Sequence, residues 1–159
     1  MSGSQVALDA LDEAELAAVA RRLAPALADG GVIHLLGELG AGKTTFARAL
    51  LQALGVGERV KSPTYSLIES YLAAGLEIHH LDLDRIADPG EVEWLGLDGL
   101  WRPGALVLVE WPQRGGAALP TADLVLALSH ADARRDLRAT SASPRGAAWL
   151  QAMRANAPD

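Results

Sequence analysis

The pattern of apolar positions changes its period several times along the chain. A short apolar segment at residues 5–8 predicts an edge strand. Asp12, followed three residues later by Glu15, is typical of a helix start. Apolar side chains then recur every three or four residues up to the turn at residues 29–31, which indicates a helix with one face toward the core: Leu16, Val19, Ala20, Leu23 and Leu27.

Two nearly continuous apolar runs follow, at residues 32–36 and 105–109. Such runs are typical of strands in a parallel sheet that is covered on both faces. The second run ends at Glu110, and we expect it to be a central strand. Residues 65–71 and 76–81 flank an Ala-Ala-Gly turn and predict a hairpin that leads into acidic residues.

Strands and helices are predicted to alternate over the rest of the chain. Two later strands are expected at residues 124–128 and 136–140, and helices at residues 44–54, 89–96 and 146–155. Half of the 159 residues are apolar, which is enough for a core. No repeat or linker divides the sequence, so it predicts one α/β domain over residues 1–159.

Composition excludes several classes of function. The formal net charge of −6 argues against independent binding to nucleic acid. The absence of cysteine excludes disulfides and cysteine-based zinc or redox chemistry. No run of 18 apolar residues is present, and the first residues lack the basic and apolar parts of a secretion signal. We therefore expect a soluble, cytoplasmic protein that does not bind membranes.

Residues 37–44 read Gly-Glu-Leu-Gly-Ala-Gly-Lys-Thr, which is a phosphate-binding loop between a predicted strand and a predicted helix. Its glycines let backbone N–H groups point at phosphates, and the helix that follows turns its positive end toward them. Lys43 is expected at the β and γ phosphates, and Thr44 at magnesium. Only Lys43 and Lys61 are lysines among the fourteen basic residues, which agrees with a phosphate role for Lys43. The alternative is a simple strand-to-helix turn.

Two acidic residues are placed to hold or orient a metal ion. Glu110 and Asp82 each end a predicted strand, and the carboxyl ends of parallel strands meet beside a phosphate loop. Asp84 is expected on the same side of the chain as Asp82, as a second ligand or an exposed acid. Alternatively, Glu110 and Asp82 are helix caps or solvated turn acids. His79 and His80 do not suggest zinc, because neighbours on a strand point to opposite faces.

Residues 61–66, Lys-Ser-Pro-Thr-Tyr-Ser, stand where P-loop proteins carry a switch segment. There Thr64 would complete the metal shell; the alternative is a surface turn stiffened by proline. Trp111 either stacks at the mouth of the site or packs beside it. Arg135, with Arg134 and Arg138, either touches the nucleotide or a partner or forms a solvated arginine face. No guanine-selecting Asn/Thr-Lys-x-Asp segment is present, so ATP is favoured.

These blocks, in this order, resemble the TsaE (YjeE) family over nearly the whole chain. The residues that carry the resemblance are 37–46, 61–67, 80–85 and Glu110-Trp111-Pro112. The resemblance implies a three-layer P-loop NTPase-like fold: a central, mostly parallel sheet with an antiparallel edge hairpin and flanking helices. It also implies a magnesium-dependent ATPase, activated by the TsaB–TsaD complex. That complex forms threonylcarbamoyladenosine (t6A) at position 37 of tRNAs reading ANN codons, so this chain would contact tRNA only indirectly, through the complex. Self-association of the chain is a further possibility.

The resemblance also implies roles for individual residues. Lys43, Asp82 and Glu110 would be catalytic, and Thr44, Asp82 and Glu110 would hold magnesium. The nucleotide would be bound by Gly37, Glu38, Leu39, Gly40, Ala41, Gly42, Lys43, Thr44, Thr45, Thr64, Trp111 and Arg135.

The sequence departs from the family pattern at three places. Asp84 replaces a usual tyrosine, Ser66 replaces a usual threonine, and the first helix offers only Ala14 or Glu15 where a threonine near the adenine is common. The first two changes remove no phosphate or metal ligand, and the third leaves the adenine pocket unassigned. Two other functions remain open: a small-molecule or nucleoside kinase, and an adaptor that binds ATP without hydrolysing it.

Overall fold

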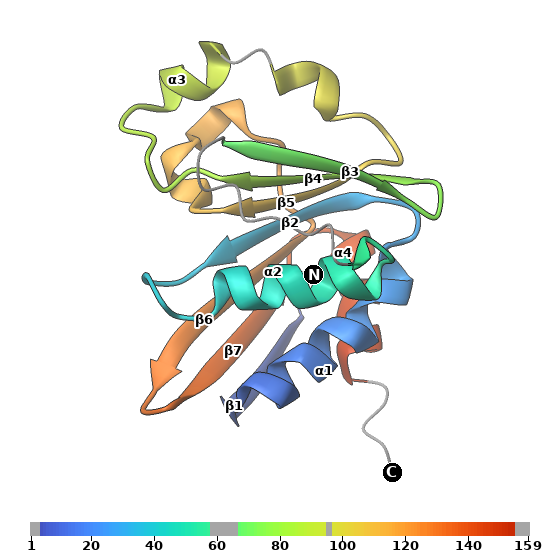
Figure 1. Cartoon of the computed structure of the whole chain (residues 1–159), viewed down its shortest axis with the longest axis vertical. Coiled ribbons are helices and arrows are strands. Elements are labelled where there is room, and N and C mark those ends of the chain that lie inside the picture. Colours follow the sequence, from blue (N-terminus) through green and yellow to red (C-terminus); the bar gives the residue numbers. More distant parts are fainter. Residues whose placement is uncertain (1–3, 58–66, 95–96, 155–159) are drawn as a thin grey trace.

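A seven-stranded mixed sheet forms the centre of the protein in a computed structural model that describes residues 4–57, 67–94 and 97–154 (Figure 1). The strand order is β1-β7-β6-β2-β5-β4-β3. The bounds of the strands are β1 Gln5–Leu11, β2 Gly31–Leu36, β3 Ile68–Ala73, β4 Leu76–Asp82, β5 Leu106–Glu110, β6 Leu124–Ala131 and β7 Arg134–Ser141.

The four central strands, β6, β2, β5 and β4, run parallel. Antiparallel pairs close both edges: β3 with β4 on one side, and β7 with β6 and β1 on the other. The α/β fold class, the edge hairpin and the edge strand near the N-terminus are therefore confirmed, and β1 and β7 add a second antiparallel edge. The hairpin strand expected from residue 65 begins at Ile68, and residues 58–66 lie outside the described part.

One face of the sheet is covered by α1 (Glu13–Leu23), η1 (Ala24–Leu27), α2 (Lys43–Ala53) and α4 (Pro144–Arg154) (Figure 1). Asp12 caps α1 in a capping box with Glu15, as the sequence predicts. The apolar face of α1 is buried together with Phe46 and Trp149 from the other helices. These helices form one apolar layer against the sheet.

The opposite face carries a smaller apolar core under α3 (Pro89–Trp94) and short 3-10 turns. Those turns are η3 (Leu97–Leu100), η4 (Pro112–Arg114) and η5 (Gly116–Ala118). Successive residues of β5 divide between the two cores: Leu106 and Leu108 face α2, and Val107 and Val109 face η5 and α3. This alternation explains the uninterrupted apolar run, since both faces of β5 are covered.

The loop between β2 and α2 requires glycine. Gly37 has φ +149°, and a Cβ atom on it would lie 2.5 Å from the carbonyl oxygen of Leu128. Gly42, the residue before α2, has φ +104°. Residues that carry a side chain rarely adopt such positive φ values. The tight turn from strand to helix therefore requires glycine at these two positions. Among the helices in the described part of the chain, none is long and apolar enough to cross a membrane.

Candidate functional site

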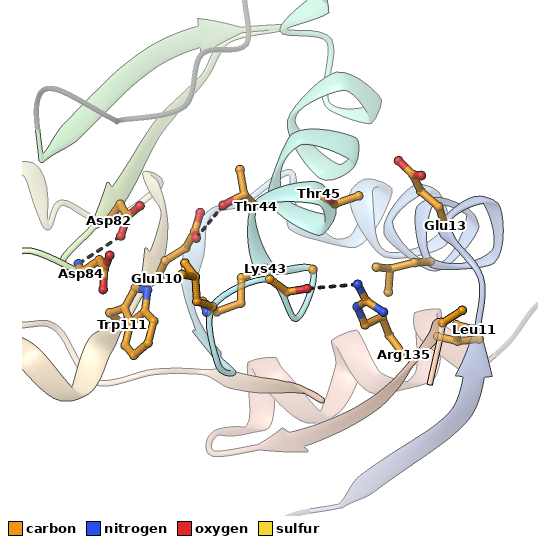
Figure 2. A pocket seen from close by; sticks show the side chains of 15 residues that line it. Leu11, Glu13, Lys43, Thr44, Thr45, Asp82, Asp84, Glu110, Trp111 and Arg135 are labelled. Carbon is orange, nitrogen blue, oxygen red and sulfur yellow. Dashed lines mark hydrogen bonds between the residues drawn. The ribbon is translucent and has the colours of Figure 1, made fainter. Parts of the chain in front are cut away.

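A pocket of about 310 Å³ opens at the carboxyl ends of the parallel strands, beside the first turn of α2 (Figure 2). In Figure 2 it extends from Asp82, Asp84 and Trp111 at one end, past Lys43, to Arg135 and Leu11 at the other. Its lining residues come from five separate parts of the chain: Leu11, Glu13, Leu16, Leu39, Gly40, Gly42, Lys43, Thr44, Thr45, Asp82, Asp84, Glu110, Trp111, Ala133 and Arg135.

Lys43 is the first residue of α2, and only 4% of its surface is exposed. Its ammonium group donates to the carbonyl oxygens of Gly37 and Glu38 and so lies back over the loop. The same group lies 4.3 Å from the ring centroid of Trp111. No side chain caps the start of α2, which leaves the positive end of the helix directed at the pocket.

Glu110, the last residue of β5, is only 1% exposed and is hydrogen-bonded through both carboxylate oxygens. Its Oε1 accepts the Thr44 hydroxyl at 3.0 Å, and its Oε2 accepts Nε2 of His80 at 2.7 Å. A buried carboxylate is tolerated when its oxygens are paired in this way. Glu110 is therefore not the solvated turn acid that the sequence left open.

Asp82 lies beside Glu110, because the two residues pair in the register of β4 and β5. Its Oδ1 accepts the backbone N–H of Asp84 at 3.1 Å. Burial raises the pKa of Asp82 above its usual range, and the negative charges of Glu110 and Asp84 raise it further, against the hydrogen bond from Asp84. Asp82 thus holds its proton more readily than an ordinary aspartate.

For Lys43, burial and the nearby negative charges shift the pKa in opposite directions. Burial lowers the pKa of its ammonium, and the carboxylates of Glu110, Asp82 and Asp84 act to raise it. One cation therefore stands among three acidic side chains. The pocket holds an excess of negative groups at this end.

Trp111 directly follows Glu110 and adopts a left-handed backbone conformation, with φ 60° and ψ 49°. This region is unfavourable for a bulky side chain and is found where the surrounding structure enforces it. Two cations lie near the indole ring, Lys43 at 4.3 Å and Arg114 at 5.5 Å from its centroid. Trp111 lines the pocket together with Lys43.

Arg135 is the one residue of the three late arginines that lines the pocket. Its guanidinium donates to the carbonyl oxygen of Gly40 at 3.1 Å and to that of Arg134 at 2.9 Å. Arg134 instead lies 3.2 Å from Glu15, and Arg138 lies 2.9 Å from Asp9. The anchoring of the glycine loop by Arg135 was not predicted from the sequence.

The structure brings most of the predicted site residues together. Leu39, Gly40, Gly42, Lys43, Thr44, Thr45, Asp82, Glu110, Trp111 and Arg135 all line the pocket. Gly37, Glu38 and Ala41 belong to the loop without lining it, and the carbonyls of the first two engage Lys43. Thr64 and the rest of the expected switch, residues 61–66, lie outside the described residues.

Several lining residues escaped the sequence analysis. Leu11 ends β1, and Ala133 lies in the turn between β6 and β7; no sequence pattern connects either residue to the loop. Leu16 was predicted only as a core residue. His80 does not line the pocket but bonds to Glu110, and it did carry a signal, because it stands two residues before Asp82 and therefore on the same face of the strand.

The two adjacent histidines point to opposite faces, as expected. His79 is bonded to Ser70 and Glu77, each at 2.7 Å, whereas His80 is bonded to Glu110. Among the described residues, no group of three histidine, cysteine, aspartate or glutamate side chains could hold a metal ion. This result does not conflict with a magnesium site, since magnesium keeps several waters and takes few protein ligands.

A glycine loop between a central parallel strand and a helix, with an acidic residue at the end of the neighbouring strand, defines the P-loop NTPase-like class of α/β proteins. The model of one family, described as "Threonylcarbamoyl adenosine biosynthesis protein TsaE", matches residues 10–138. The chain belongs to the TsaE family.

Individual relatives agree with this membership. The chain is 42% identical over 106 residues to a protein of Haemophilus influenzae named tRNA threonylcarbamoyladenosine biosynthesis protein TsaE, covering 67% of each chain. It is 36% identical over 132 residues to the Bacillus subtilis protein of the same name, covering 82% of each. The crystal structure of Bacillus subtilis YdiB superposes with a TM-score of 0.78 at 26% identity, over 98% of this chain and 97% of that one.

Proposed function

We propose that this protein is the ATP-binding and ATP-hydrolysing component of the pathway that forms t6A at position 37 of tRNAs reading ANN codons. The observation that carries the proposal is the hydrogen bond between Thr44 and Glu110, which stands beside Lys43 at the end of the glycine loop. Membership of the TsaE family, whose named relatives are t6A biosynthesis proteins, supports the pathway.

Phosphate binding is assigned to the loop and the start of α2. Backbone N–H groups at an uncapped helix start attract anions, and Lys43 adds a full positive charge. The Lys43 ammonium now donates to the carbonyls of Gly37 and Glu38, and phosphate oxygens would take over these bonds. This exchange replaces neutral acceptors by charged ones, which make stronger hydrogen bonds.

The residues present fit a magnesium ion. Thr44, Glu110 and Asp82 offer hard oxygen atoms, the type of ligand that magnesium prefers. Three carboxylates around one ammonium also leave a negative excess that a divalent cation would offset. When bound, magnesium would neutralise part of the charge on the phosphates. Thr44 and Glu110 would hold its shell, and their existing hydrogen bond already places their oxygens together.

Asp82 and Glu110 receive different roles. Glu110 is fully buried, with both oxygens engaged, which suits a residue that holds the metal shell. Asp82 is half-buried, and its raised pKa makes it a better acceptor than an ordinary aspartate for a proton from the attacking water. We therefore assign water orientation to Asp82.

The far end of the pocket is assigned to the base. Leu11, Leu16 and Ala133 provide apolar surface there, which suits a planar aromatic ring. The absence of a guanine-selecting segment favours adenine. Arg135, which holds the carbonyl of Gly40, would keep the loop in place beside the nucleotide.

The TsaB–TsaD complex is the proposed partner and activator. The net charge of −6 makes independent tRNA binding unfavourable, so the tRNA would be contacted through the complex. ATP turnover on this chain would then support repeated modification by its partners. We also propose that residues 1–159 form a single domain.

The test measures binding and turnover separately. Calorimetry with ATP and magnesium should show binding to the wild-type chain, and phosphate release should rise when TsaB and TsaD are added. Glu110→Ala and Asp82→Ala should remain folded but release phosphate at background level. Glu93→Gln, which removes an exposed carboxylate that does not line the pocket, is the matched control and should behave as wild type.

The alternatives give other results. Unchanged turnover in Glu110→Ala would reject the assigned site. Turnover that requires a small acceptor molecule, and not TsaB–TsaD, would indicate a kinase. Nucleotide-dependent association with no phosphate release would indicate an adaptor.

A further inference from the structure

We propose that His80 is a positioning residue for the magnesium site, which holds the Glu110 carboxylate in one orientation through the Nε2–Oε2 hydrogen bond. The inference rests on the proposed function, because Glu110 holds magnesium only under that proposal. It concerns a residue that lines no part of the pocket and would act through Glu110 alone.

The geometry of the pair is tight. Nε2 of His80 lies 2.7 Å from Oε2 of Glu110, and both side chains are 2% exposed. A carboxylate oxygen accepts, so Nε2 is the donor in this bond. The other oxygen of the same carboxylate, Oε1, accepts the Thr44 hydroxyl at 3.0 Å. The carboxylate is therefore held from two sides, by β4 through His80 and by α2 through Thr44.

The sheet places His80 for this contact. His80 and Asp82 stand two residues apart on β4, and Glu110 pairs with Asp82 on β5, so all three side chains leave the sheet on the face that α2 covers. The Cα partner of His80 on β5 is Leu108, two residues before Glu110. The imidazole thus reaches Glu110 diagonally across the two strands.

Packing alone does not explain a histidine at this position. Nδ1 of His80 is buried and has no hydrogen-bond partner among the described residues. A buried polar nitrogen without a partner destabilises the fold, so an apolar side chain at this core position would be more favourable for packing. The bond from Nε2 to Glu110 is what the imidazole adds.

Orientation matters because a carboxylate rotates freely about its last bond when nothing holds it. With Oε2 fixed by His80, Oε1 stays toward Thr44, where the metal shell is proposed. Residues that orient metal ligands in this way typically contribute about 10- to 100-fold to metal affinity or activity. His80 would contribute by the same route.

His79 is a matched internal control. It is also buried, at 3% exposed, but both of its ring nitrogens are hydrogen-bonded, to Ser70 and Glu77 on the opposite face. A change at His79 therefore disturbs a buried imidazole of the same strand without touching Glu110.

The experiment compares His80→Asn with His80→Gln. Glutamine places an amide donor at about the reach of Nε2, whereas asparagine is one bond shorter and does not reach Glu110. ATP binding is titrated by calorimetry with and without magnesium, and turnover with TsaB–TsaD gives kcat and KM. Thermal unfolding of each variant shows that it is folded, and His79→Asn and Glu110→Gln complete the set.

We expect His80→Asn to lower the apparent magnesium affinity by about 10- to 100-fold and to reduce kcat, with ATP affinity in the absence of magnesium unchanged. His80→Gln should recover most of this loss, and His79→Asn should titrate as wild type. Combining His80→Asn with Glu110→Gln should add little to Glu110→Gln alone, because both changes act on one carboxylate.

Three results would overturn the inference: His80→Asn titrates as wild type, His80→Gln is as impaired as His80→Asn, or His79→Asn shifts the magnesium titration equally. Failure of the proposed function looks different, since the wild-type chain would then show no magnesium-dependent ATP binding at all. If Glu110→Gln lowers the apparent magnesium affinity relative to wild type while His80→Asn matches wild type, only the role of His80 is lost.

Discussion

The hydroxyl of Thr44 and Oε1 of Glu110 lie 3.0 Å apart, although 66 positions separate the two residues along the chain. Their hydrogen bond joins the first turn of α2 to the last residue of β5. Both partners are therefore held in place by packed secondary structure before any ligand binds. Such preorganisation lowers the entropic cost of binding, because these side chains are already ordered.

Removal of the Thr44 hydroxyl should weaken the dependence on magnesium. Thr44→Ala removes a proposed metal ligand and also the donor to a buried carboxylate oxygen of Glu110. Thr44→Ser keeps the hydroxyl and is the matched control. Magnesium titrations of ATP turnover should show a higher magnesium requirement for Thr44→Ala only. Identical titrations for Thr44→Ala and wild type would refute the role.

Lys43→Arg should lose nucleotide affinity although the positive charge is kept. The ammonium donates to the carbonyls of Gly37 and Glu38 and lies 4.3 Å from the Trp111 ring, and a larger, planar guanidinium would not reproduce these compact contacts. The loss of charge-assisted hydrogen bonds to phosphate predicts about 10- to 100-fold weaker ATP binding by calorimetry. An arginine variant with wild-type affinity would show that a compact cation is not required.

Arg135→Gln should loosen the glycine loop. The guanidinium donates to the carbonyl of Gly40, so its loss frees the loop and should speed amide hydrogen exchange over residues 37–42. ATP affinity should fall in parallel. Arg138→Gln, which removes an ion pair with the exposed Asp9, is the control and should leave loop exchange unchanged. Equal exchange in both variants would exclude anchoring by Arg135.

His34 should make the stability depend on pH. Burial lowers the pKa of His34 in the folded protein, against a hydrogen bond from Nε2 to the Pro120 carbonyl. Since the folded pKa lies below the unfolded value of about 6.5, the stabilising contribution is complete above that pH and is lost as pH falls through the folded pKa.

Urea denaturation between pH 8 and pH 5 measures this contribution, which changes by at most about 1.4 kcal/mol per pH unit for one proton. His34→Gln keeps a donor for the Pro120 carbonyl and removes the titration. The variant should therefore lose less stability than wild type on acidification. A parallel decline of both proteins would show that His34 is not responsible.

Gly146→Ala should destabilise the protein through close packing of α4. A Cβ atom at Gly146 would lie 1.8 Å from the carbonyl oxygen of Asp123, so the helix would have to move. Overpacking of this kind typically destabilises by about 1–3 kcal/mol. Gly99→Ala, where a Cβ would meet nothing within 4 Å, should change the unfolding free energy little. Thermal unfolding of the two variants compares them directly.

Local patterns in the sequence predict most of the secondary structure. The capping box of Asp12 and Glu15 forms as predicted, because its hydrogen bonds join residues three apart. The glycine loop is also local: a run of eight residues specifies its turn and the helix that follows. The uninterrupted apolar run of β5 reports burial on both faces, which is a property of one segment.

The convergence of distant segments is different. That Glu110 receives Thr44 and His80 depends on β5 lying between β2 and β4, and no local pattern contains this strand order. The same holds for Leu11 and Ala133 at the far end of the pocket.

By itself, the sequence determined the loop, the helix start and the acidic strand ends, because each depends on the chemistry of neighbouring residues. Only the tertiary structure decided which oxygen of Glu110 faces Thr44, that His80 reaches the other oxygen, and that Arg135 holds Gly40. These contacts follow from how packed layers align, and that alignment is a property of the whole core.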